Sequence, residues 1–103
     1  MLSTVSSRHG DLDPSLRDRT ETVLARLAGF APQAVEAAVI FDTVPEGGWV
    51  EIKLHLPGGH ILVATATEKV HRTALDRAEE KLRKQIDRAA TAARRGRRQV
   101  KLP

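Results

Sequence analysis

Hydrophobic and polar positions along the chain follow two different periods, which predicts both helices and strands. Between residues 14 and 29, apolar side chains recur every three or four positions, as in a helix with one buried side. Asp13 can cap the first turn, Pro14 suits the first helical position, and Gly29 suits a left-handed exit. The buried stripe of this helix is predicted to contain Leu16, Thr20, Val23, Leu24 and Leu27.

Other segments alternate apolar and polar residues, a pattern that is typical of strands. The clearest of them follows a turn at residues 45–48 and places Val50, Ile52 and Leu54 on one side. A further turn at residues 57–60 leads into the next strand, so an antiparallel meander of three strands is expected. The predicted strands are residues 3–8, 34–44, 48–56 and 61–67, of which the first has a thin apolar content.

The helical period returns after Thr67, the predicted cap, and nothing interrupts it before Gly96. Such a helix would have about 27 residues and a length of about 40 Å, so its far end should overhang the sheet. Residues 96–103 are basic and poor in apolar side chains, and we expect them to form a flexible tail. The predicted apolar side of this helix contains Ala74, Leu75, Ala78, Leu82, Ile86, Ala89 and Ala93.

These elements predict one α+β domain at residues 1–95, in the order β-α-β-β-β-α. Because each helix has a single apolar face, both are expected to cover one face of a four-stranded sheet. A length of 103 residues also suits one domain. No apolar run approaches the roughly 20 residues that a membrane span requires, and residues 1–10 do not resemble a secretory signal. We therefore expect a cytoplasmic protein.

Charge is distributed unevenly between the two parts of the chain. Residues 1–67 contain five basic and eight acidic side chains, whereas residues 68–103 contain twelve basic and five acidic ones. This asymmetry indicates that the second part contacts a polyanion, with nucleic acid and an anionic membrane surface as the candidates.

The cations of the second helix are also ordered on its surface. A helical wheel places Lys81, Lys84 and Arg88 within about 40° of Arg77, with no acid among them and with the apolar side about 140° away. Cations spaced by one helical turn can follow a phosphate backbone. The predicted nucleic-acid-binding residues on this helix are Arg77, Lys81, Lys84, Arg88, Arg94 and Arg95.

Two other interpretations of these cations remain open. One is a solvated helix face followed by a disordered basic tail. The other is a membrane-surface helix, which is less well supported because the apolar side is rich in alanine and is needed to cover the sheet.

Catalytic and metal-binding patterns are not found in the sequence, so we expect neither an enzyme nor a cofactor or small-molecule substrate. The four histidines, His9, His55, His60 and His71, do not form pairs at ligand spacing, and cysteine is absent. The few aromatic residues are not arranged to stack unpaired bases. Trp49 lies on the polar side of its strand, where it could contact a partner or cover a sheet edge.

The stretch from residue 55 to residue 85 resembles the ribosome hibernation promoting factor and ribosome-associated inhibitor family, also called sigma-54 modulation proteins. In that family an LPGG hairpin, here residues 56–59, precedes a strand and then a helix. Arg8 matches a family arginine at the end of the first strand, whereas His71 and Pro14 depart from the family pattern. The helix positions that match the family are Ala74, Leu75, Asp76, Lys81, Leu82, Gln85 and Ile86.

The resemblance implies a short-form protein that binds the small ribosomal subunit and its 16S-type ribosomal RNA. Binding would occupy the decoding cleft between head and body, so it would block messenger and transfer RNA and protect idle ribosomes in stressed cells. Arg8 would then join the helix cations as an RNA contact. A homodimer is a further possible assembly of the chain. The alternative function is a non-ribosomal protein-interaction or regulatory module that uses the exposed sheet face.

Overall fold

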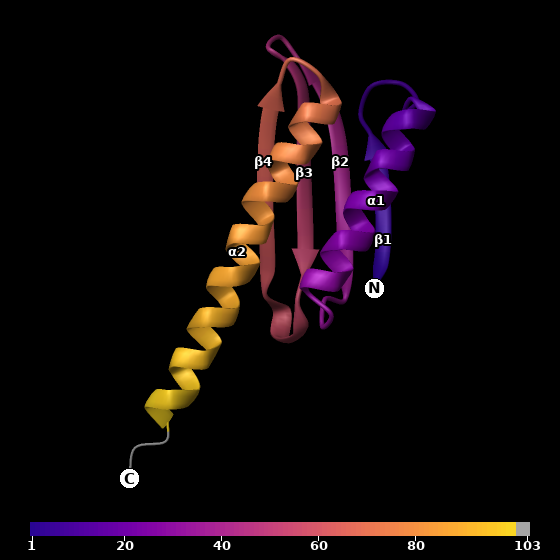
Figure 1. Cartoon of the computed structure of the whole chain (residues 1–103). Helices are drawn as coiled ribbons and strands as arrows, with labels where there is room; N and C mark the ends of the chain where they lie inside the picture. The colour runs from indigo at the N-terminus through magenta and orange to yellow at the C-terminus, as the bar shows by residue number, and fades with distance from the viewer. Residues whose placement is uncertain (101–103) are drawn as a thin grey trace.

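The computed structural model describes the backbone of residues 1–100 and the side chains of residues 1–92 (Figure 1). Four strands and two helices follow one another in the predicted order β-α-β-β-β-α, so the α+β fold class is confirmed. A short 3-10 turn, η1, lies between the last two strands. The elements are β1 (Leu2–Ser7), α1 (Pro14–Phe30), β2 (Glu36–Val44), β3 (Gly47–His55), η1 (Pro57–Gly59), β4 (Ile61–Glu68) and α2 (His71–Val100).

The four strands form one sheet in the order β1-β2-β3-β4. β1 is parallel to β2 because α1 carries the chain back between them, and the two remaining pairs are antiparallel, which confirms the predicted meander. The sheet is therefore bounded by β1 on one side and by β4 on the other.

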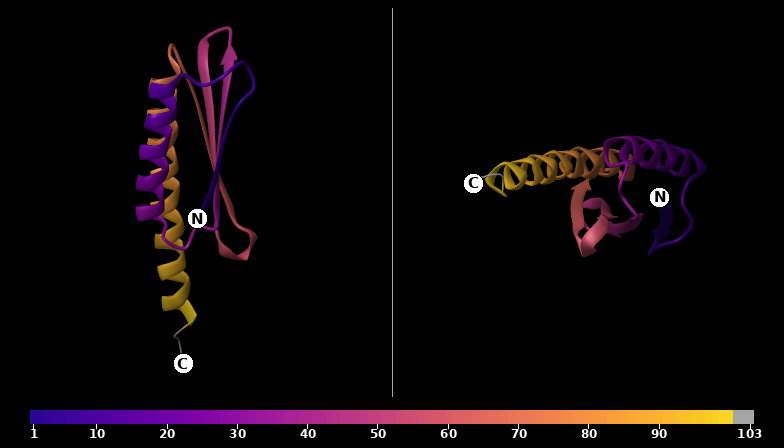
Figure 2. Two further views of the ribbon diagram at one scale, coloured as in Figure 1. Left: turned by 90° about the vertical axis from the view of Figure 1, so that its right-hand side faces the viewer. Right: turned by 90° about the horizontal axis from the view of Figure 1, so that it is seen from below.

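Both helices lie on the same face of the sheet, as Figure 2 shows from the side, and the core fills the space between the two layers. Alternate residues of β3 are fully buried against the helices, whereas their neighbours face the open side of the sheet. The buried core includes Val23 and Leu27 from α1, Leu75 and Leu82 from α2, and Phe41, Val50, Ile52 and Leu54 from the sheet.

The predicted left-handed exit of α1 at Gly29 is wrong. Gly29 is the penultimate helical residue and does not have a positive φ. The helix ends at Phe30, and the N–H of the C-cap residue Ala31 donates to the carbonyl of Leu27 over 2.9 Å. Pro32 follows and cannot continue the helical hydrogen bonds. The chain therefore leaves the helix with a negative φ of −132° at Ala31, not through a left-handed residue.

Both predicted ends of α2 also differ from the structure. Thr67 belongs to β4 and does not cap the helix, which begins at His71, with the Ala74 N–H donating to the Val70 carbonyl. At the other end the helix passes through Gly96 and reaches Val100. The overhang beyond the sheet is present (Figure 1), and the functional division of the chain at residue 96 stays a prediction.

Two adjacent glycines allow the start of β3 to approach the start of α2. A Cβ atom on Gly48 would lie 2.7 Å from the backbone nitrogen of His71, and one on Gly47 would lie 2.4 Å from the Glu68 carbonyl oxygen. Gly47 also has a φ of +135°, which is unfavourable for other residues. This contact fixes the first turn of α2 over the sheet.

Candidate nucleic-acid interface

Ion pairs between the two helices use two of the acidic residues of α2. The Arg26 guanidinium donates two hydrogen bonds of 2.8 Å to Glu79, which is only 6% exposed, and Arg19 pairs with Asp76 at 3.1 Å. The hydrogen bond to Glu79 raises the pKa of Arg26. These acids therefore face α1 and are already neutralised.

One cation of α2 is also directed toward α1. The Arg83 guanidinium lies 4.0 Å from the centre of the Phe30 ring, a cation–π contact at the end of α1. Arg83 and the two ion pairs define the α1-facing side of α2.

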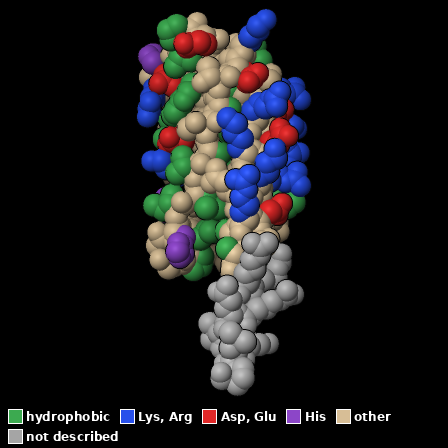
Figure 3. All heavy atoms as spheres, turned by 90° about the vertical axis from the view of Figure 1, so that its left-hand side faces the viewer, with side chains coloured by type: hydrophobic (Ala, Val, Ile, Leu, Met, Phe, Trp, Pro, Cys, Tyr) green, Lys and Arg blue, Asp and Glu red, His purple; other side chains and the backbone are tan. Residues whose placement is uncertain are grey.

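The four predicted cations Arg77, Lys81, Lys84 and Arg88 are all exposed, and we refer to them as the cationic row. Figure 3 shows the side of the molecule formed by α2 and β4, where Lys and Arg side chains gather along one margin with few acids between them. The structure thus brings together the α2 residues that the wheel grouped. Their role in binding RNA stays a prediction.

The members of the cationic row differ in how free they are. Arg77 lies 3.9 Å from the exposed carboxylate of Glu80, a loose pair one helical turn away. Among the residues whose side chains are described, neither Lys84 nor Arg88 has an ion-pair or hydrogen-bond partner. These two residues are the least neutralised positions of the row.

Lys81 has a second role that sequence reasoning missed. Its ammonium group donates a hydrogen bond of 2.9 Å to the Thr65 carbonyl, and Gln85, one turn later, donates one of 2.7 Å to the Val63 carbonyl. Both carbonyls lie on the outer edge of β4. Lys81 and Gln85 therefore hold α2 against that edge and satisfy backbone groups that have no strand partner.

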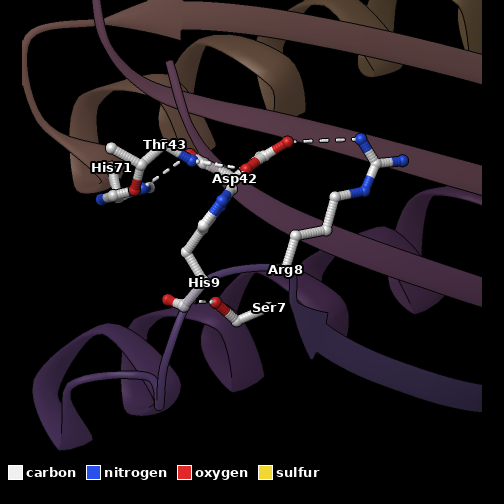
Figure 4. Close-up of polar contacts among 6 residues, drawn as sticks. All are labelled: Ser7, Arg8, His9, Asp42, Thr43 and His71. Atoms are coloured by element: carbon white, nitrogen blue, oxygen red, sulfur yellow. Dashed lines mark hydrogen bonds and ion pairs between the residues drawn. The ribbon is translucent and has the colours of Figure 1, made fainter. Parts of the chain in front are cut away.

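Arg8 is not part of the cationic row. It follows β1, at the sheet edge opposite β4, and its guanidinium lies 5.2 Å from the ring centre of Trp49. Figure 4 shows Arg8 and His9 directed toward Asp42, at distances of 3.3 Å and 2.5 Å from its two carboxylate oxygens. Arg8 is thus a partly neutralised cation on another side of the molecule.

Asp42 is held in its charged form by these neighbours. Burial opposes its ionisation, but hydrogen bonds from the Thr43 N–H, His9 and Arg8 outweigh that effect and lower the pKa of Asp42 below its ordinary value. The Asp42 carbonyl accepts a bond of 2.8 Å from Nε2 of His71, which also packs edge-on against Phe41. His71 is therefore a packed side chain.

Arg94 and Arg95 were also predicted to bind nucleic acid, but their side chains lie outside the described residues. Within the part of the chain that is described, no three His, Asp or Glu side chains are grouped as a metal ion would require. A search of the same residues finds no helix with the length and apolar character of a membrane span.

The fold is shared with solved structures of two other proteins. A ribosomal subunit interface protein from Coxiella burnetii superposes with a TM-score of 0.81 at 23% identity, over 88% of this chain and 99% of that chain. The N-terminal domain of Protein Y from Thermus thermophilus superposes with a TM-score of 0.73 at 26% identity, over 85% and 98%. The molecule therefore has the α+β fold of this class of proteins.

Sequence comparison assigns the chain to a family. The model of the Sigma 54 modulation protein / S30EA ribosomal protein family matches residues 3–94, and the chain belongs to that family. The chain is also 27% identical over 88 residues to ribosome-associated factor Y of Haemophilus influenzae, which covers 85% of this chain and 81% of that protein. The resemblance seen in the sequence is thereby confirmed.

Proposed function

We propose that this protein binds the small ribosomal subunit and inhibits translation as a hibernation factor. Its cationic row contacts 16S-type ribosomal RNA in the decoding cleft, where the bound protein excludes messenger and transfer RNA. The family assignment and the ribosome-associated relatives support the partner. Steric occlusion requires binding alone, with no chemical step, and a ribosomal partner implies a cytoplasmic location in which idle ribosomes of stressed cells are protected.

One observation carries the proposed role of the cationic row. Asp76 and Glu79 are paired across the helix interface and Glu80 lies beside Arg77, while Lys84 and Arg88 have no partner among the described side chains. Phosphates attract unpaired, solvent-facing cations and release their counterions when such cations bind.

Co-sedimentation with purified small subunits tests this proposal. We expect the native chain to pellet with the subunits at low salt and the variant carrying Lys84→Glu and Arg88→Glu to bind at least about tenfold more weakly. Lys81 is left unchanged because it also holds the edge of β4. Failure of the native chain to pellet at any salt concentration would refute ribosome binding.

A matched control separates the cationic row from net charge. The variant with Arg17→Glu and Lys53→Glu changes the charge by the same amount but alters α1 and the open sheet face. We expect its affinity for small subunits to lie within about twofold to threefold of that of the native chain, because salt screens charges that are distant from the RNA. Equal loss in both variants would show that total charge, and not the row, determines binding.

Occlusion has its own measurement. Small subunits loaded with messenger RNA and initiator transfer RNA should lose the transfer RNA as the native chain is added, and the Lys84 and Arg88 double variant should not displace it. Simultaneous retention of the protein and both RNAs would contradict the steric mechanism while leaving ribosome binding intact.

A second candidate function is suggested by the open face of the sheet. Ile61 and Val63 are 52% and 40% exposed there, and a protein-interaction module could use this apolar surface to bind a partner. Treatment with RNase distinguishes the two functions, because a protein partner would be retained and a ribosomal complex would be lost.

A further inference from the structure

The two edge strands of the sheet, β4 and β1, differ in whether side chains bond to their outer backbone groups. At β4, Lys81 and Gln85 donate hydrogen bonds to the outward carbonyls of Thr65 and Val63. Among the described residues, no side chain donates such a bond to the outer edge of β1. An uncovered edge strand is a template for pairing with another strand.

The pairing of β1 with β2 identifies which of its backbone groups are free. The Leu2 N–H donates to the Val35 carbonyl over 3.1 Å, and the Arg8 N–H donates to the Phe41 carbonyl over 2.9 Å. Because alternate residues of a parallel strand point to the same neighbour, the N–H and C=O groups of Ser3, Val5 and Ser7 point away from the sheet. The free edge therefore offers three regularly spaced donor and acceptor pairs.

The residues of β1 do not protect this edge. Natural edge strands usually carry lysine, proline or a bulge, but the β1 sequence LSTVSS has no charge and no proline. Exposed apolar side chains adjoin it, since Leu2 is 74% exposed and Val35, its hydrogen-bonding neighbour, is 55% exposed. The edge thus combines free backbone groups with uncovered apolar surface.

We propose that β1 pairs with β1 of a second copy of this chain, in antiparallel fashion about Val5, to form one continuous sheet. In this register Ser3 faces Ser7 of the second copy, Thr4 faces Ser6, and Leu2 faces Arg8. No like charges oppose one another, and small hydroxyl side chains are favourable cross-strand neighbours. The strand is therefore complementary to itself.

The location of the other charges also favours a second copy as the partner. The cationic row lies beside β4, at the opposite edge of the sheet, so the two rows would be at the far ends of the joined sheets and would not repel each other strongly. A contact formed mainly by a strand of 6 residues is small beside the roughly 1,200–2,000 Å² of stable interfaces. The dimer is thus a weak one that depends on concentration.

Sedimentation equilibrium of the full chain, from about 1 μM to about 1 mM, tests the proposal. We expect the native chain to shift toward dimer across this range. The variant S3K/S7K sets lysines opposite one another and should raise the dissociation constant about tenfold or more, whereas S3K/S7E sets opposite charges there and should restore dimerisation. Circular dichroism verifies that each variant is folded.

The outcomes are distinct. A native chain that stays monomeric throughout the range would overturn the proposal and leave β1 open to other partners. Dimerisation of S3K/S7K as strong as that of the native chain would assign the contact to another surface. If S3K/S7K fails to fold, S3K/S7E alone tests the register. Dimerisation of S3K/S7E would support the pairing of residue 3 with residue 7 of the second copy, and its loss would overturn that pairing. None of these results depends on ribosome binding, because the cationic row is unchanged.

Discussion

At the scale of single residues, the members of the cationic row are not equivalent. Lys81 and Lys84 are both exposed lysines three residues apart, yet only Lys81 bonds to the β4 edge. We expect Lys81→Met to lower the free energy of unfolding by about 0.5–1.5 kcal/mol and Lys84→Met to change it by less than about 0.5 kcal/mol. Urea denaturation measures the difference, and equal stability of the two variants would rule out the proposed edge role of Lys81.

The carboxylate of Asp42 makes the stability of the protein depend on pH in a defined direction. Its folded pKa is below the ordinary value of 3.8, so the ionised group stabilises the fold above that pH. This contribution is lost as the pH falls through the folded pKa. The native chain should therefore exceed an Asp42→Asn variant in stability near neutral pH, and the gap should narrow under acid. A stability difference between the native chain and Asp42→Asn that does not change with pH would contradict the lowered pKa of Asp42.

Gly47 and Gly48, which allow the start of α2 to approach the sheet closely, are expected to be intolerant of substitution. A Cβ on Gly48 would meet the backbone of His71, which cannot move without shifting the helix, so Gly48→Ala should cost about 1–3 kcal/mol of stability. Gly29→Ala is the control, because a Cβ there meets nothing within 4 Å inside a helix and should stabilise by about 0.5–1 kcal/mol. Thermal unfolding measures both variants, and the melting temperature should fall for Gly48→Ala and rise for Gly29→Ala.

At the scale of elements, the contact between the helices depends on an asymmetric ion pair. Glu79 is nearly buried, whereas the side chain of Arg26 is 39% exposed. Removing Arg26 leaves a buried carboxylate unpaired, so Arg26→Gln should cost about 1–3 kcal/mol, while Glu79→Gln should cost about 1 kcal/mol or less. Chemical denaturation of the two variants measures which one loses more stability. A larger loss for Glu79→Gln would show that Arg26 is the more desolvated partner.

The periodicity of the chain was sufficient to predict every strand and both helices, but it was less reliable for their ends. Gly29 and Thr67 are residues that commonly end or begin helices, yet the helix ends depend on where the chain must meet the sheet. Thr67 extends β4 because it pairs with Trp49 on β3. Such pairings are set by tertiary structure and leave no mark on local sequence.

The candidate site was predicted in part for the same reason. The wheel grouped the cationic row correctly on one exposed side of α2, because a helix fixes the spacing of its own side chains. It could not show that Asp76 and Glu79 pair with α1, or that Lys81 reaches β4, since those contacts join residues far apart in the chain. Arg8 was predicted as an RNA contact by family resemblance, and it lies after β1 at the opposite edge of the sheet from the row, where its RNA contact stays a prediction.

At the scale of the whole molecule, the sheet separates two surfaces with different chemistry. α2 and the covered edge of β4 present cations, while β1 at the other edge is uncharged and uncovered. This arrangement allows RNA binding at one edge and self-pairing at the other without mutual interference. RNA binding would then depend on the electrostatics of one side of α2.

The affinity for small ribosomal subunits as a function of salt concentration tests that account most directly. Each phosphate contact that is lost should reduce the slope of log affinity against log salt by about 0.7–0.9, so Lys84→Gln with Arg88→Gln should lower the slope by about 1.4–1.8 relative to the native chain. Arg17→Gln with Lys53→Gln should leave the slope unchanged. A native affinity that does not depend on salt, or equal slopes for the native chain and the row variant, would contradict binding of ribosomal RNA through the cationic row.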